Sequence, residues 1–429
     1  MTAGSAALDR TSAPAASTRM ISTLTGALMA LWIGVIPFID LAQRPKIGIG
    51  IKAFSQSREV SPALAAALLM VVLAGAIPPL VAALGSSLDF RRAKYFAFGI
   101  LGLCLSIPLS YLALYDLRDA AYVAIVYYVF VCMILLISAD VDSEILLRSF
   151  FTSLVLVNCA SMIAVLIDHD FAWGRLMGRT APNYWGAIAQ TTLIAVIAMR
   201  GWLFRGGAIA LSLYVLSCTQ SRGSMLALVV AYAGVAGILF FAVRGKAWLW
   251  LALGLMVLVA VIVSGDYVTN DLMMLSDPLR GVGSGATGRA HAWAETWDLF
   301  AAHPWVGVGY RQHEQYLLSD SSAHNGYLAT LAETGIFGFM AYIVFIFGAL
   351  GLACAKVLRK PTAPRVACMA FLLAYIFTGL VERVGLNTGN LYSLVLIVAA
   401  ALAWRIDGDA AAAPPAASSP LGVPRALAP

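Results

Sequence analysis

The sequence predicts an all-α, polytopic membrane protein with about 12 membrane-spanning helices and one large outward-facing loop that contains short helices. Of its 429 residues, 61% are hydrophobic and 12% are charged, whereas about 25% of the residues in an average soluble domain are charged. Apolar runs of about 17 to 25 residues recur along the chain, each long enough to cross a hydrocarbon layer as a helix. The short alternating strands of a membrane barrel do not appear, and helices satisfy every backbone group inside lipid.

The two ends of the chain differ from this pattern. Residues 1–20 are mostly Ala, Ser, Thr and Pro, and residues 405–429 are mostly Ala and Pro. We expect both to be disordered segments on the cytoplasmic side. The apolar run at 21–42 is too long for the core of a cleaved signal peptide, so it is expected to be the first span.

The expected spans form two groups, at 21–264 and 336–404, separated by the loop at 265–335. After the first span, further spans are expected at 62–84, 95–113, 121–139, 149–167, 185–199, 206–218, 224–243, 247–264, 336–355, 365–382 and 388–404. This arrangement places both termini on one side. The distribution of Lys and Arg favours the cytoplasm for them, although the bias is weak.

The basic residues assigned to the outer face are mostly arginines near helix ends. Arginine presents a planar fork of donors that matches phosphate oxygens, whereas lysine is a point charge. The formal charge of +6 therefore indicates phosphate groups at the membrane surface, with no nucleic acid expected. Arginines at this depth also bind the phosphates of ordinary lipids, and that alternative stays open for each of them.

The segment 281–338 concentrates the polar residues of the chain, with His291, His303, His313 and His324 out of five histidines. His324 and Asn325 are followed by Gly335-Ile336-Phe337-Gly338. This His-Asn and Gly-x-x-Gly pattern, in a large loop late in a many-helix protein, resembles the signature of the O-antigen ligase and polysaccharide polymerase superfamily of bacterial inner-membrane glycosyltransferases. The resemblance covers this loop and the general layout of the chain.

His324 is the expected general base. We expect Ser321 and Ser322 to cap a helix that begins just before it, so that the helix dipole favours a neutral imidazole able to accept a proton. A single histidine in such a loop is more often an ordinary polar residue. The motif and the nearby arginines favour catalysis.

Arg222 and Arg289 are the expected catalytic cations. Arg222 lies in Ser221-Arg222-Gly223 between two spans, which resembles a turn of the family whose arginine helps to bind the lipid diphosphate. Arg289 ends a Gly-x-Gly-x-x-Gly run that starts at Gly283. Because no strand precedes this run and no Walker lysine follows it, we reject a nucleotide-binding loop and expect a helix from about Arg289 to His303.

Further residues of the loops are expected to contact substrate or to shape the site. Gly335 and Gly338 are interpreted as allowing close approach of a neighbouring helix, and 303–309 as turning the chain back toward the membrane. Aromatic rings either stack on sugars or mark the membrane interface. The residues expected to bind substrate are Asn325, Arg175, Arg179, Arg311, Tyr327 and Trp293.

Other chemistries find little support in the sequence. There is no Gly-x-Ser-x-Gly, no His-Glu-x-x-His and no CxxC, and the six cysteines lie in or beside apolar runs. We therefore predict no metal and no cofactor, and interpret the cysteines as small core residues. A polysaccharide or lipid transporter is the alternative from another class, although the paired broken helices of inverted repeats are not apparent.

The resemblance implies a donor glycan on undecaprenyl diphosphate, transferred at the periplasmic face of the inner membrane. His324 would deprotonate the acceptor hydroxyl, and the arginines would hold the departing diphosphate, so that neither nucleotide nor metal is required. A ligase passes the glycan to a lipid A core sugar, whereas a polymerase adds it to another lipid-linked glycan. The sequence favours the ligase only modestly.

Overall fold

The computed structural model describes residues 16–44, 62–111, 117–172, 174–242, 289–318, 322–386 and 390–406. The helices are α1 (Ala16–Gly34), α2 (Ile36–Gln43), α4 (Pro62–Ala74), α5 (Ile77–Gly85), α6 (Lys94–Leu109), α7 (Leu117–Ser138), α8 (Ser143–Asp168), α9 (Pro182–Ala195), α10 (Trp202–Thr219), α11 (Arg222–Ala242), α13 (Arg289–Ala302), α14 (Gly326–Arg359), α15 (Ala363–Val381) and α16 (Leu391–Trp404). Short 3-10 turns occur at Phe90–Ala93, Val196–Ala198 and His313–Gln315. A small antiparallel hairpin joins β1 (Phe171–Ala172) to β2 (Arg175–Leu176).

The predicted all-α, multi-pass membrane fold is confirmed. Within the described residues, nine helical segments are long and apolar enough to cross a membrane. The spans predicted at 185–199 and 388–404 coincide with the shorter helices α9 and α16. The span predicted at 247–264 lies outside the described residues, so the count of 12 remains a prediction. Residues 1–15 and 407–429 of the two predicted disordered ends also lie outside them, whereas residues 16–20 form the start of α1.

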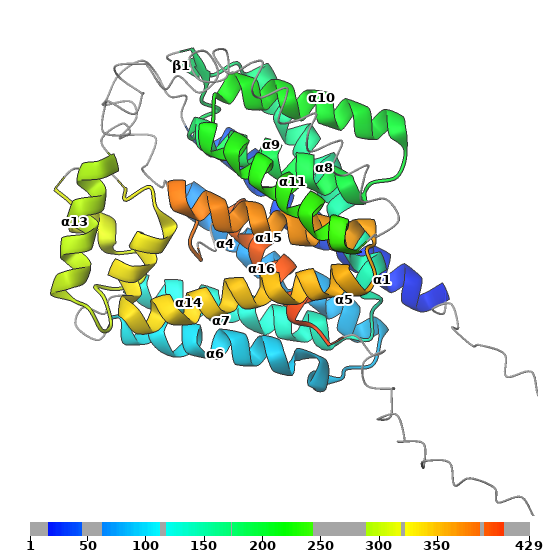
Figure 1. Ribbon diagram of the computed structural model, residues 1–429, viewed down its shortest axis with the longest axis horizontal. Coiled ribbons are helices and arrows are strands. Elements are labelled where there is room, and N and C mark those ends of the chain that lie inside the picture. Colours follow the sequence, from blue (N-terminus) through cyan, green and yellow to red (C-terminus); the bar gives the residue numbers. More distant parts are fainter. Residues whose placement is uncertain are drawn as a thin grey trace, which may run out of the picture.

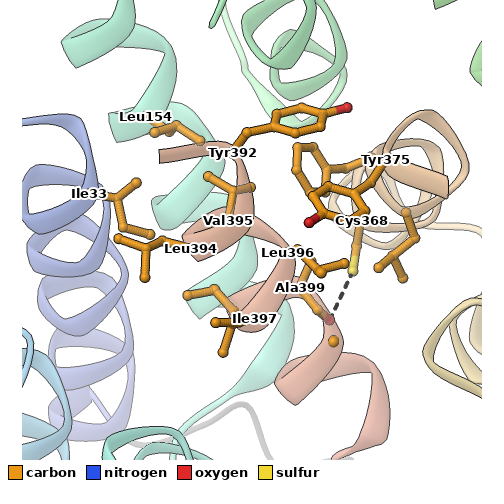
Figure 2. Close-up of a cluster of buried hydrophobic side chains, with 14 of the residues drawn as sticks. Ile33, Leu154, Cys368, Tyr375, Tyr392, Leu394, Val395, Leu396, Ile397 and Ala399 are labelled. Atoms are coloured by element: carbon orange, nitrogen blue, oxygen red, sulfur yellow. Dashed lines mark hydrogen bonds between the residues drawn. The ribbon is translucent and has the colours of Figure 1, made fainter. Parts of the chain in front are cut away.

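Helix α16 forms the centre of the bundle. All its residues from Leu391 to Ala403 are buried, which explains why it is apolar on every side. Figure 2 shows Tyr392 and Leu396 of α16 beside Tyr375 of α15, with Ile33 of α1 and Leu154 of α8 on the other side. A helix of this length is too short for a typical span and instead holds together the longer helices around it.

The candidate site residues gather at one end of the bundle, called here the site end. Helices α8 and α15 end there, and α9, α11, α14 and α16 begin there, so their terminal residues come together in space. Helix α13 packs beside the start of α14 at this end (Figure 1). It begins and ends as the sequence predicts, within one residue.

Candidate active site at the end of the helix bundle

A cavity of about 160 Å³ opens at the site end. It lies among the first turns of α9, α11 and α16, the end of α15 and His324, two residues before α14. His324 and Glu382 are two of the charged or titratable side chains that line it. Because helix N-termini present unpaired N–H groups and a positive dipole end, the convergence of several of them favours an anionic or hydroxyl-bearing ligand nearby.

His324 forms a pair with Glu382. Its Nδ1 lies 3.4 Å from Glu382 Oε2, and its side chain remains 35% exposed. A histidine that donates its Nδ1 hydrogen to a carboxylate presents the lone pair of Nε2 as a proton acceptor. The 3.4 Å separation is long for a hydrogen bond, as is common for catalytic contacts before the substrate is bound. The arrangement suits an imidazole whose Nε2 is to accept a proton.

The turn that carries His324 is fixed by four hydrogen bonds. The Trp293 indole donates to the carbonyl of Ala323 at 2.6 Å, and the backbone N–H of Gly326 donates to the carbonyl of Glu382 at 3.1 Å. Asn325 Oδ1 accepts from the second and third N–H groups of α14, each at 3.0 Å. His324 itself has a φ of +44°, in the left-handed region that histidine enters more readily than most residues.

The expected cap of this helix was wrong. Asn325, rather than Ser321 or Ser322, is the N-cap of α14, and His324 lies one residue before it instead of in the first turn. Asparagine caps a helix as well as serine does, and a left-handed residue cannot continue a helix. Asn325 and Trp293, expected to bind substrate, therefore also hold the His324 turn in place.

Glu382 joins His324 to two arginines. Its Oε1 accepts from Arg289 NH2 at 3.0 Å and from Asn183 Nδ2 at 2.6 Å. The amide oxygen of Asn183 in turn faces Arg175 NH2 at 3.3 Å. Arg289 and Arg175, which the sequence only suggested as site residues, thus belong to one network with the histidine.

Arg289 and Arg222 both lie at the junction of α13, α11 and α15. Arg289 donates to the carbonyl of Val381 at 2.9 Å. Arg222 is the first residue of α11, and a Cβ on the next residue, Gly223, would lie 3.0 Å from the side chain of Val381. The two predicted catalytic arginines therefore begin two helices that meet the end of α15, next to Glu382.

Sequence reasoning missed Glu382 and Asn183. A signal for Glu382 existed, because it follows directly after the apolar run of α15. A carboxylate at the C-terminal end of a helix is disfavoured by the helix dipole, and an ionisable residue beside a membrane span is a functional candidate. Asn183 carries no such signal, because a polar residue in the first turn of a helix is ordinary.

A second ionic cluster, called here the buried cluster, lies beside the cavity. His313 Nδ1 is 2.5 Å from Glu333 Oε1, and the His313 side chain is fully buried. Arg383 contacts Glu333 at 2.7 Å and Glu314 at 2.6 Å. Burial opposes ionisation of Glu314, but Arg383, the Ser322 hydroxyl and His313 together outweigh it and leave the pKa of that carboxyl below its usual range.

The break of α14 at Gly335 and the segment 303–309, which packs against it, hold the buried cluster in place. Gly335, with a φ of +63°, interrupts α14, and the carbonyls thus released from Ala332 and Glu333 accept from Val308 and Gly309 N–H groups at 3.0 Å. A Cβ on Gly335 would lie 2.3 Å from the backbone of Trp305. The expected close approach therefore occurs at Gly335 against the 303–309 segment and at Gly338 against helix α6, where a Cβ would lie 3.1 Å from the Ser106 hydroxyl.

Three residues expected to bind substrate have other partners. Arg179 forms a two-pronged ion pair with Asp168, with contacts of 2.7 and 3.0 Å. The guanidinium of Arg311 lies over the ring of Tyr122, 5.1 Å from its centroid. Tyr327 donates to the carbonyl of Ile376 on α15 at 2.8 Å. The structure does not bring these three side chains to His324, and their substrate contacts remain predictions.

In the described part of the chain, no three His, Cys, Asp or Glu side chains gather as a metal site would require. The six cysteines are free and lie within helices. The chemistry that the cavity residues themselves offer is proton transfer by a histidine–carboxylate pair, next to arginines suited to phosphate.

The fold and this cavity define a multi-pass membrane protein with a histidine–carboxylate pair and arginines at one end of the bundle. The family model for O-antigen ligase matches residues 207–343, a segment that includes Arg222, Arg289 and His324 but ends before Glu382. The match confirms the resemblance to the O-antigen ligase and polysaccharide polymerase superfamily, and it supports a membrane glycosyltransferase of ligase or polymerase type. A search of curated proteins found no match.

Proposed function

We propose that this protein is an O-antigen ligase, which transfers a glycan from undecaprenyl diphosphate to a sugar of the lipid A core at the periplasmic face of the inner membrane. The observation that carries the proposal is the His324–Glu382 pair at the cavity, with Arg289 bound to the same carboxylate. A base beside arginines suited to phosphate is what the transfer of a glycan from a lipid diphosphate needs. Residues 207–343 of the same chain match the family model for O-antigen ligase.

The proposed reaction is a single displacement. His324 Nε2 takes the proton of the acceptor hydroxyl while that oxygen forms a bond to the anomeric carbon of the donor sugar. The bond from this carbon to the diphosphate breaks, and undecaprenyl diphosphate leaves with the electron pair. The configuration at the anomeric carbon inverts.

Each site residue has one role in this reaction. Glu382 holds the Nδ1 hydrogen of His324, so that Nε2 is the basic nitrogen. Arg289 uses two of its guanidinium N–H groups on Glu382 and the Val381 carbonyl, and its remaining donors, with those of Arg222, bind the charge that develops on the diphosphate. No nucleotide supplies energy, because the donor is already activated.

A polymerase that extends a lipid-linked glycan is the second candidate, because the same family and the same residues support it. The two differ in what a strain without this gene accumulates. Long glycans stranded on the lipid carrier would support the ligase, because assembly proceeds and transfer fails. Single repeat units on the carrier would instead identify a polymerase.

A transporter predicts a different result in a purified system. The full chain, reconstituted with lipid-linked glycan and lipid A core, should form a new glycosidic bond that mass spectrometry detects. Reconstituted protein that forms no such bond, while moving the lipid-linked glycan across the bilayer, would contradict the enzyme proposal.

A further inference from the structure

The floor of the cavity is built from uncharged hydrogen-bonding groups. Gln190 Nε2 donates to the hydroxyl oxygen of Tyr392 at 2.7 Å, and that hydroxyl lies 3.2 Å from Thr378 Oγ1. Because Thr378 Oγ1 donates its own hydrogen to the carbonyl of Ala374, Tyr392 must be the donor in its contact with Thr378. Gln190 therefore donates to Tyr392, and Tyr392 donates to Thr378. The Tyr392 oxygen keeps a lone pair that can accept a hydrogen bond from a ligand.

Asn390 supplies the complementary donors. Its Oδ1 accepts the backbone N–H of Tyr392 at 2.8 Å and so caps α16. This contact fixes the orientation of the amide, which leaves both hydrogens of Nδ2 for a ligand. Asn390 lines the same cavity as Tyr392, and no described residue is a partner of its Nδ2.

The cavity is poorly suited to the diphosphate. The cavity wall carries the charged side chains of Glu382 and Arg383, of which Glu382 contacts Arg289 and Arg383 contacts Glu314 and Glu333. Each of these two guanidinium groups thus already contacts at least one carboxylate. A dianion entering the cavity would therefore compete with these carboxylates for the guanidinium groups, whereas sugar hydroxyls can donate to carboxylates and to neutral oxygens alike.

The size and the walls of the cavity suit one sugar residue. Its 160 Å³ is close to the roughly 150 Å³ of a protein cavity that binds a single six-membered ring, so it has room for one sugar ring. Ala187, Ile188 and the ring of Tyr184 add apolar wall, against which the C–H face of a sugar packs. His324 lines the cavity together with these groups, so a hydroxyl of the bound sugar lies within its reach.

We propose that this cavity is the subsite for the acceptor sugar, with Asn390 Nδ2 and the Tyr392 oxygen as specificity-determining contacts, while the lipid diphosphate binds outside it on the side of Arg222. The inference rests on the proposed transfer reaction, because the sugar whose hydroxyl faces the base is the acceptor. It also goes beyond that proposal, because it assigns binding to residues outside the segment that matches the family.

The test measures binding without turnover. The full chain in lipid nanodiscs is titrated calorimetrically with free core oligosaccharide released from lipopolysaccharide, and separately with undecaprenyl diphosphate that carries no sugar. Asn390→Ser keeps a good helix cap without adding charge, and Tyr392→Phe keeps the ring. Each should weaken oligosaccharide binding about tenfold, since one hydrogen bond is lost, and leave undecaprenyl diphosphate binding unchanged.

Two exchanges of the same kind away from the cavity serve as controls. Asp142→Ser alters the N-cap of α8 at the opposite end of the bundle, and Tyr232→Phe removes a hydroxyl that donates to the Leu193 carbonyl at 2.7 Å. Both should bind the oligosaccharide as the wild type does.

Unchanged oligosaccharide affinity in Asn390→Ser and Tyr392→Phe, or weaker binding of undecaprenyl diphosphate alone, would overturn the subsite. So would a free repeat-unit oligosaccharide binding there while the core oligosaccharide does not, since the acceptor would then be a second donor-type glycan. Because no reaction is required, these results stand apart from the activity of His324 variants, which decides the proposed function.

Discussion

Of the three histidine–glutamate pairs among the described residues, the two that join distant parts of the chain, His313–Glu333 and His324–Glu382, lie in different surroundings. His313 lies 2.5 Å from Glu333, and both side chains are almost completely sealed from solvent. His324 lies 3.4 Å from Glu382, and 35% of its side chain is exposed at the cavity. A sealed pair can fix a structure but cannot reach a substrate, whereas an open pair can exchange a proton with one.

The two pairs are linked through neighbouring residues of the chain. The backbone at Glu382 is extended, with φ −140° and ψ 151°, and side chains alternate in direction along an extended backbone. Glu382 therefore points to the cavity while Arg383 enters the buried cluster. The buried cluster therefore anchors Arg383 and, through it, the neighbouring Glu382, whose carboxylate contacts His324.

The largest effect on activity is expected at the open pair. His324→Ala should reduce transfer by about a hundredfold to ten-thousandfold, the usual contribution of a general base, without changing the amount of protein in the membrane. Transfer by reconstituted protein is measured beside protein level and melting temperature. A well-folded His324→Ala protein with normal transfer would remove the assignment of the base.

The next effect is expected for the arginines that begin α11 and α13. Arg222→Ala and Arg289→Ala should each lower transfer by about a hundredfold, as loss of a group that stabilises transition-state charge typically does. Lysine at either position should restore little, because the planar fork is lost. Arg91, exposed at the opposite end, provides the control Arg91→Lys, and full rescue of the site variants by lysine would argue against two-pronged phosphate binding.

A smaller loss is expected when only the orientation of the base is disturbed. Glu382→Gln keeps the size of the side chain and should lower transfer about tenfold to a hundredfold, as changes in partners of functional histidines do. The pH profile of transfer should change as well, because His324 loses its carboxylate. In a protein that already carries His324→Ala, Glu382→Gln should lower transfer little further. Independent, additive losses of transfer from the two substitutions would disprove the positioning role.

At the buried pair, a substitution should lower the stability of the fold rather than the rate of transfer. His313→Asn leaves Glu333 with Arg383 alone and should destabilise the protein by about 3 kcal/mol, the usual cost of removing one partner from a buried ionic contact. The melting temperature should fall while transfer per folded molecule stays within about twofold. Loss of transfer at an unchanged melting temperature would mean that the buried pair takes part in the chemistry.

The smallest effect concerns acid stability at the edge of the buried cluster. Because the pKa of Glu314 in the folded chain lies below its ordinary value of 4.5, the ionised carboxylate stabilises the fold above about pH 4.5 and loses this contribution as pH falls further. Glu314→Gln should therefore cost about 1 kcal/mol or less near pH 7. Melting curves of the two proteins should converge below pH 4.5, and a constant difference across this range would contradict the assignment.

The sequence by itself determined the class of this protein. Runs of apolar residues specify membrane helices because lipid offers the backbone no other partner, and the His-Asn and Gly-x-x-Gly motif indicated the resemblance to the O-antigen ligase and polysaccharide polymerase superfamily, which the family model over residues 207–343 supports. His324, Arg222 and Arg289 were found in the same way, because their residue types sit in a local pattern.

Only the tertiary structure decided which partners these residues have. Glu382 lies far along the chain from His324, and its pairing with His324 and Arg289 depends on where α15 ends beside the starts of α13 and α14. The burial of His313 could not be read from its neighbours in the chain either, because it is set by the 303–309 segment docking on the break at Gly335. Spacing along a chain specifies helices and motifs, whereas the chemistry of a side chain depends on charges and solvent brought to it by packing.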